Sequence, residues 1–214
     1  MEVAVPQRRR SGRGGQALRN DARIPEAARE VFMADPGAPI AAVAARAGVG
    51  ISALYRRYPS KEALLAQVAR DGLRRYNELV EAAVADDGDA WQAFADFMAR
   101  ILDAGTHAIA SRLAGTFTPT PDLMAAAARA AQLNTALLER TKERGGLRPD
   151  VVVDDLSLIL EQLHSIRLGD EARTWELRRR YLALALDGLR VTGSSLPGPG
   201  PSPEELARRW IPAG

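Results

Sequence analysis

What the chain lacks excludes several classes of protein. Its 214 residues include no cysteine, which excludes disulfide bonds, thiolate metal sites and a cysteine nucleophile. Its two histidines, His107 and His164, have no clustered carboxylates nearby in the sequence, so a metal site is not expected. Gly48 and Gly50 follow no strand and lack a third glycine, so they do not form a dinucleotide-binding loop. The sequence therefore predicts a protein that is not an enzyme and holds no metal or cofactor.

Long hydrophobic runs are also missing. No apolar run approaches the roughly 20 residues that a membrane span needs. The arginines of RRRSGRGG, near the start, are not followed by the apolar segment of a secretory signal. Hydrophobic residues nevertheless make up 46% of the chain, which is enough for a folded core. We therefore expect a folded cytoplasmic protein with no membrane partner.

Charge is distributed unevenly along the chain. Residues 1–75 carry 14 Arg and Lys against 7 Asp and Glu, a net of +7, and residues 76–214 carry 15 against 20, a net of −5. The two parts sum to the overall charge of +2. A basic head on an acidic body favours contact between the head and a polyanion such as nucleic acid. Chance clustering of arginines in a flexible tail is the alternative.

Apolar residues recur at helical spacing along most of the chain, and no segment alternates as a strand would. We therefore predict an all-α protein, with a helix-turn-helix domain near the N-terminus and a helical bundle after it. The expected parts are a disordered basic arm over 1–19, a helix-turn-helix domain over 20–75 whose fourth helix continues to about 85, a helical domain over 86–191, and a Pro/Gly-rich tail over 192–214. We expect the first helix to begin near Asp21 and Asp122 to cap a helix over 122–144.

The stretch GVGISALYRRYPSK, residues 48–61, combines a turn, buried-type residues and cations. A short helix is expected to end at Gly48, where a left-handed backbone favours glycine, and a second one to stop before Pro59. Leu54 and Tyr58 then face inward. In this arrangement the second helix of the pair enters the DNA major groove.

The outward side of that helix carries groups that bind DNA. The expected outward residues are Ser52, Ala53, Arg56 and Arg57. Arginine on such a helix can contact guanine with two hydrogen bonds or reach a phosphate. Lys61 lies in the first turn of the next helix, where its cation and the backbone N–H groups can hold a phosphate. A plain helical hairpin with a few arginines is the alternative.

The run IAAVAARAGVGISALYRRYPSKEALLAQV, residues 40–68, resembles the signature of the TetR family of transcriptional regulators. The matching features are Ala44, Ala47-Gly48-Val49, Leu54-Tyr55, Tyr58 and Ser60-Lys61-Glu62-Ala63-Leu64. The resemblance implies a homodimer that binds double-stranded operator DNA and carries a larger helical domain for dimerisation and a small effector. It also implies the site residues. These are Tyr55 and Lys61 at phosphates, Ser52, Ala53 and Arg57 at or near base edges, and Ile51 at the start of the helix.

The sequence departs from the family pattern in three places. Ala53 stands where a threonine is usual, and Pro39 and Ile40 stand where a phosphate-contacting threonine is often found. The Arg56-Arg57 pair is more basic than usual, so affinity is expected to depend more on charge. The N-terminal arginines Arg8, Arg9, Arg10 and Arg13 could add a flexible DNA-binding arm, or form a solvated tail.

The region after residue 86 is predicted to hold an effector pocket and a dimer interface. We expect a hydrophobic or aromatic effector, because the candidate lining residues are mostly apolar. These are Trp91, Phe94, Met98, Ile101, Phe117, Met124, Leu133, Leu137, Leu163 and His164. A plain core, with a satisfied or surface histidine, is the alternative. The helices over 150–168 and 173–191 are apolar on more than one side, which favours a four-helix interface with a two-fold mate. Its candidate residues are Leu156, Ile159, Leu163, Trp175, Leu182, Leu186 and Leu189.

These observations favour a sequence-specific DNA-binding transcriptional regulator. We expect a repressor that binds a palindromic operator as a dimer and is released from it by a small-molecule effector. Two other functions stay open. One is a non-specific architectural DNA-binding protein, which the acidic body disfavours. The other is a helical small-molecule-binding protein with no regulatory role.

Overall fold

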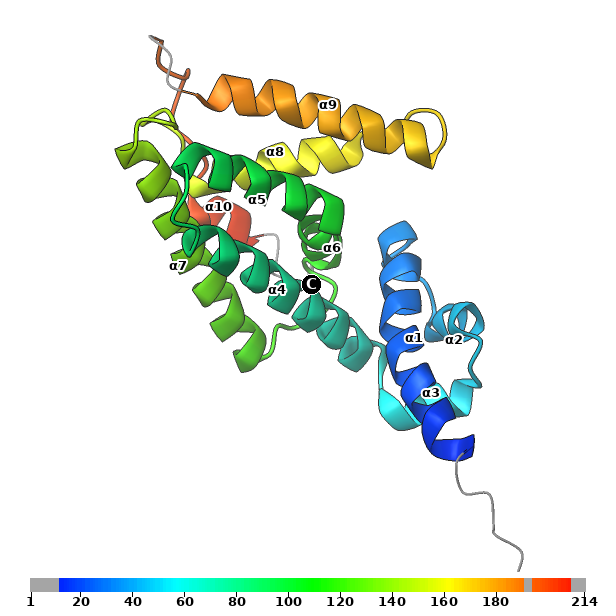
Figure 1. The fold of residues 1–214 in the computed structure, drawn as a ribbon. Coiled ribbons are helices and arrows are strands. Elements are labelled where there is room, and N and C mark those ends of the chain that lie inside the picture. Colours follow the sequence, from blue (N-terminus) through cyan, green and yellow to red (C-terminus); the bar gives the residue numbers. More distant parts are fainter. Residues whose placement is uncertain (1–11, 191–193, 209–214) are drawn as a thin grey trace, which may run out of the picture. The chain divides into compact units, whose positions relative to one another are not determined.

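The computed structural model describes residues 12–190 and 194–208, and they are helical with no β-strand, as the sequence predicted (Figure 1). The chain divides into two compact units, Met1–Leu64 and Leu65–Gly214. The division falls inside the fourth helix, earlier than the expected end of the first domain at residue 75. None of the described helices is both long enough and apolar enough to cross a membrane.

The first unit contains three helices and the start of a fourth. They are α1 (Gly12–Ala34), α2 (Ile40–Ala47), α3 (Ile51–Arg57) and α4 (Lys61–Val84). Helix α1 begins at Gly12, so the prediction of disorder up to residue 19 and of a helix starting near Asp21 is wrong for residues 12–19. The remaining part of the predicted arm, residues 1–11, lies outside the described residues.

Apolar residues at helical spacing form the core of the first unit. Phe32 of α1, Val43 of α2 and Leu54 of α3 are all fully buried. An ion pair between Arg46 and Glu30, with 2.6 Å between nitrogen and oxygen, joins α2 to α1 at the surface. This pair is exposed and adds little stability, so the apolar core holds the three helices together.

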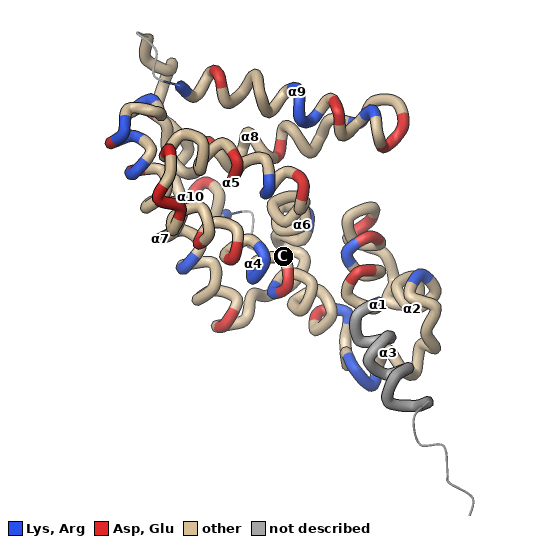
Figure 2. The backbone as a smooth tube through the Cα atoms, in the orientation of Figure 1, with Lys and Arg blue, Asp and Glu red and all other residues tan. Residues whose placement is uncertain are grey.

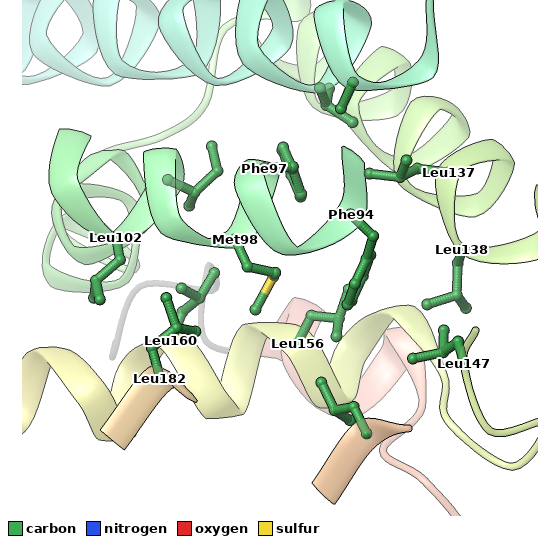
Figure 3. Packing of buried hydrophobic residues seen from close by; sticks show 14 of the residues in the cluster. Phe94, Phe97, Met98, Leu102, Leu137, Leu138, Leu147, Leu156, Leu160 and Leu182 are labelled. Carbon is green, nitrogen blue, oxygen red and sulfur yellow. The ribbon is translucent and has the colours of Figure 1, made fainter. Parts of the chain in front are cut away.

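The second unit contains the rest of α4 and six further helices. They are α5 (Ala90–Ala104), α6 (Thr106–Leu113), α7 (Pro121–Glu143), α8 (Val153–Ser165), α9 (Glu171–Leu189) and α10 (Pro203–Ala207). Helix α5 is central, because it contacts α6, α7, α8 and α9. Figure 3 shows its buried face, where Phe94, Met98 and Leu102 point toward leucines of the neighbouring helices.

Side-chain caps define where several helices begin. The Ala63 N–H donates to Ser60 Oγ at 3.1 Å, which caps the start of α4. The expected cap at Asp122 is wrong, because Thr120 is the N-cap of α7 and its Oγ1 accepts from the Leu123 N–H at 3.3 Å. Proline at the first helical position of α7 suits this arrangement, since its missing N–H would have no partner there.

The described part of the C-terminal tail is held against the second unit. Arg148 is buried, donates to the Ser194 carbonyl at 2.6 Å and pairs with Asp150. The Leu196 N–H donates to Asp150 Oδ2, with a distance of 2.7 Å. The hydrogen bond from Arg148, and to a smaller extent the one from the Leu196 N–H, lower the pKa of Asp150 to about 2. The predicted Pro/Gly-rich tail is therefore anchored at its beginning.

Candidate functional site

The turn between α2 and α3 has the geometry that the glycine predicted. Gly48 lies in the left-handed region, with φ 66° and ψ 37°. Its N–H donates to the Ala45 carbonyl at 3.2 Å, and the Val49 N–H donates to the Ala44 carbonyl at 3.0 Å. These two bonds form a Schellman motif, which satisfies the last carbonyls of α2 and turns the chain sharply. The direction in which α3 leaves α2 is therefore fixed by local backbone geometry.

Helix α3 has one buried side and one exposed side. Leu54 is fully buried and Tyr58 nearly so, which attaches the helix to the core of the first unit. Ile51, Ser52, Tyr55, Arg56 and Arg57 are exposed and Ala53 is half-buried. The residues predicted to contact DNA on α3 thus share the side that faces away from the core. Their contacts with DNA stay a prediction.

Basic residues follow this side onto the next helix. Figure 2 shows lysine and arginine at the end of α3 and the start of α4. Lys61 is half-buried, and its Nζ lies 5.5 Å from the centre of the Phe32 ring. This cation–π contact holds the lysine beside the capped N-terminus of α4, where N–H groups and positive charge favour a phosphate. Arg8, Arg9 and Arg10 of the predicted arm lie outside the described residues.

A second site is a cavity of about 440 Å³ within the second unit. Four helices and a loop residue line it. They are α4 (Ala69, Gly72, Leu73, Tyr76), α6 (Thr106, His107, Ile109, Ala110), Pro119, α7 (Leu123, Met124, Ala127, Ala130, Ala131, Asn134) and α8 (Val153, Asp154, Ser157). Its volume falls within the range of roughly 300–1,000 Å³ that small-molecule sites occupy. Most of the wall is apolar, with a few polar groups from different helices.

The polar groups of the cavity differ in how they are satisfied. Tyr76 donates to Asn134 Oδ1 at 2.9 Å, across from α4 to α7. Burial raises the pKa of Tyr76 to about 12, against the smaller lowering effect of that hydrogen bond. Thr106 is only 5% exposed, and its Oγ1 has no hydrogen-bond partner among the described residues. The cavity thus combines one satisfied pair with one unsatisfied hydroxyl.

Only one of the ten residues predicted for the effector pocket, Met124, lines this cavity. The large apolar candidates belong to the packed core or lie against it. These are Trp91, Phe94, Met98, Ile101, Leu133, Leu137 and Leu163. Phe117 is also buried and does not line the cavity. The reason is steric, since bulky side chains fill space whereas a hollow needs small ones. The alanines of AAAARAA, residues 125–131, were the signal that the prediction missed.

The two histidines have different environments. His164 is not in the cavity, and its Nδ1 donates to the Leu160 carbonyl at 2.8 Å. Its Nε2 has no described partner, and burial lowers its pKa. His107 does line the cavity, with Nε2 3.9 Å from the Glu161 carboxylate. His164 therefore does not line this cavity, and its predicted role in an effector pocket stays a prediction.

The outer side of α8 and α9 carries an apolar groove. Its lining residues are Ile159, Gln162, Leu163, Ile166, Leu168, Leu177, Tyr181, Leu184 and Ala185. Ile159 and Leu163 were predicted for the dimer interface. The other predicted residues lie in the chain's own core or half-buried against it. These are Leu156, Leu182 and Leu189, with Trp175 and Leu186 beside them. Among the residues that line the groove, the large apolar side chains exposed to solvent are Leu168, Tyr181 and Leu184.

Comparisons with known proteins match both units. A family model described as bacterial regulatory proteins of the tetR family matches residues 24–68. A second model, for the C-terminal domain of SbtR-like transcriptional regulators, matches residues 86–191. Among solved structures, a TetR transcription regulatory protein from Mycobacterium vanbaalenii is 29% identical, with a TM-score of 0.54. That match covers 83% of this chain and 98% of the other.

Two further structures agree in fold. A TetR transcriptional regulator from Streptomyces coelicolor is 26% identical at a TM-score of 0.54, covering 81% of this chain and 99% of that one. A gamma-butyrolactone receptor, described as ArpA-like, is 20% identical at a TM-score of 0.58, covering 80% and 98%, and it is similar in fold alone. No curated protein matched the sequence. Because the family models match the helix-turn-helix unit and the helical unit in turn, the chain belongs to the TetR family of DNA-binding transcriptional regulators.

Proposed function

We propose that this protein is a repressor that binds a palindromic operator as a homodimer and is released by a small-molecule effector. The observation that carries the proposal is the two-sided character of α3. Its buried Leu54 and the Gly48 turn fix the helix, and its exposed side presents hydroxyl, phenol and guanidinium groups together. A helix held in this way suits the major groove, because base readout needs side chains at fixed positions.

Individual roles follow from the chemistry of the side chains on α3 and α4. Tyr55 and Lys61 donate to phosphates, which sets the position of α3 on the duplex. Ser52 and Arg57 reach base edges, where arginine hydrogen-bonds guanine with two N–H groups. Ala53 has no hydroxyl, so it contributes an apolar contact of the kind that suits a thymine methyl group.

Dimerisation is assigned to the apolar groove of α8 and α9. Tyr181 and Leu184 are about half exposed, at 50% and 56%, and both line the groove. Exposed apolar surface of this kind is costly in water and is removed by pairing with a second copy. A two-fold dimer also presents two α3 helices to two half-sites, so that the dimer binds DNA more tightly than a single chain would.

Effector control is assigned to the cavity of the second unit. Helix α4 runs without a break from Lys61 to Val84, and Ala69 to Tyr76 on the same helix line the cavity. A ligand that shifts this part of α4 acts on the helix that also carries Lys61. The effector then weakens DNA binding if it favours an arrangement that the operator does not.

Selection of DNA from a random pool tests the proposal most simply. We expect a palindromic sequence to be enriched. Arg57→Ala with Lys61→Ala should weaken binding to the selected DNA about 100-fold or more, and should make binding less dependent on salt. Arg129→Ala with Lys142→Ala removes the same charges from the second unit and is the matched control, with unchanged binding expected. Equal enrichment of all sequences would contradict the proposal.

The dimer is tested separately by sedimentation or light scattering. Leu184→Glu places a charge in the groove and should shift the protein toward monomer at micromolar concentration, because a buried charge without a partner is costly. Leu196→Glu changes another exposed leucine, outside the groove, and should leave the mass unchanged. A monomeric wild-type protein, or a dimer unaffected by Leu184→Glu, would contradict the assignment of this face.

A further inference from the structure

The wall of the cavity carries an acidic side chain and no lysine or arginine among its described lining residues. Asp154 of α8 is the one acidic residue among them. His107 also lines the cavity, but its ring faces the carboxylate of Glu161. A ligand that enters therefore meets mostly apolar surface and one carboxylate that no lining lysine or arginine neutralises.

Asp154 lies in the first turn of α8, where the helix dipole favours an acidic residue, but no bonded partner accounts for its side chain. The neighbouring Asp155 caps α8, because its Oδ2 accepts from the Val152 N–H at 2.8 Å. The side chain of Asp154 makes no hydrogen bond or ion pair with any described residue. Burial raises its pKa, and the carboxylates of Asp155 and of Glu204 on α10 raise it further. Beyond the dipole of α8, a cation from a ligand would stabilise the charged form of this carboxylate.

A second observation points to a ligand at the same place. Thr106 lines the cavity, is 95% buried by its exposed fraction of 5%, and has an Oγ1 with no partner among the described residues. Buried hydroxyls in folded proteins nearly always have a hydrogen-bond partner. Its presence next to a hollow of about 440 Å³ indicates a polar group that arrives with the ligand.

We propose that this cavity binds an amphipathic organic cation, an amine on an apolar body, with the charged nitrogen against Asp154. The apolar body occupies the space between the alanines of α7 and Ile109 of α6. A polar group of the ligand forms a hydrogen bond with the Thr106 hydroxyl. This inference rests on the proposed function, because it names the ligand class of the effector site.

Three probes with the same chain and different heads test the ligand class. Decylamine, decanol and decanoate are cationic, neutral and anionic at pH 7. Titration calorimetry with the full chain, without DNA and below the concentration at which the probes aggregate, gives each dissociation constant. We expect decylamine to bind about tenfold tighter than decanol, with decanoate the weakest of the three. Decanoate binding as tightly as decylamine, or no binding by decylamine, would overturn the proposal.

Asp154→Asn and Asp122→Asn form a matched pair of variants. Each removes one carboxylate from the second position of a helix, α8 or α7, and only Asp154 lines the cavity. We expect Asp154→Asn to weaken decylamine binding about tenfold and leave decanol unchanged. Asp122→Asn should change neither. An unchanged preference for decylamine in Asp154→Asn would show that the carboxylate does not select the ligand.

The result is read independently of DNA binding. Decylamine binding through Asp154 in a protein with no preference among DNA sequences would refute the regulator and keep the ligand class. Operator-specific DNA binding, together with tighter binding of decanoate than of decylamine, would refute the ligand class and keep the regulator.

Discussion

Replacing Gly48 by alanine tests whether the left-handed turn fixes the position of α3. The change puts a Cβ on a residue with φ 66°, where a side chain costs about 1–2 kcal/mol. Space is not the difficulty, since the nearest atom, a guanidinium nitrogen of Arg23, would be 3.4 Å away. The lower entropy of an alanine in the unfolded chain offsets part of the strain. We expect Gly48→Ala to destabilise the α2–α3 region by about 1 kcal/mol.

Gly50→Ala is the matched control two residues away. Gly50 has φ −68° and ψ 140°, and a Cβ there would meet nothing within 4 Å. Alanine adopts this conformation without strain, so Gly50→Ala should be neutral to within about 0.5 kcal/mol. The two variants remove the same flexibility from one turn. The difference between them therefore isolates the left-handed conformation.

Amide hydrogen exchange of residues 40–58, measured by mass spectrometry, reports the stability of this region without interference from the second unit. Exchange in Gly48→Ala should be about fivefold faster than in the wild type, and in Gly50→Ala nearly unchanged. Equal exchange in the two variants would refute the argument that the conformation of Gly48 determines the turn.

Two predictions concern the second unit. Arg140 donates to three backbone carbonyls at and beyond the end of α4. Arg140→Met should therefore lower the free energy of unfolding in urea by about 2–4 kcal/mol. The control Arg129→Met removes only a surface ion pair and should lower it by less than about 1 kcal/mol. Equal costs would contradict this. The raised pKa of Tyr76, about 12, favours the neutral phenol in the folded state. The resulting contribution to the free energy of unfolding is fully present below about pH 10 and is lost as the pH rises to about 12. The free energy of unfolding of Tyr76→Phe should therefore fall less steeply than that of the wild type between these pH values. An equal slope in the two proteins would contradict the prediction.

The helix-turn-helix was predictable because its signals are local. Gly48 and Pro59 each determine backbone geometry or a helix end within a few residues, and the structure has α2 and α3 where they predicted them. The start of α1 was not predictable in this way. Gly12–Asn20 is rich in glycine and arginine, which indicated disorder, yet these residues continue the helix.

The cavity could not be predicted because it depends on packing between distant segments. Asp154 and Thr106 lie 48 residues apart in sequence (154 − 106), and neither stands in a recognisable motif. The prediction selected large apolar residues, which fill the core. The apolar groove of α8 and α9 depends on packing in the same way. Both stripes of α9 are apolar, and only the structure shows that Leu182 packs inward and Leu184 outward.

Sequence preference in DNA binding tests the central claim most directly. Fluorescence anisotropy would compare a labelled duplex selected from a random pool with a shuffled duplex of equal length and composition, at one stated salt concentration. We predict that the selected duplex binds at least about 1,000-fold tighter, with two protein chains per duplex. Equal affinity for the two duplexes would contradict the account, because a helix that reads bases must distinguish them.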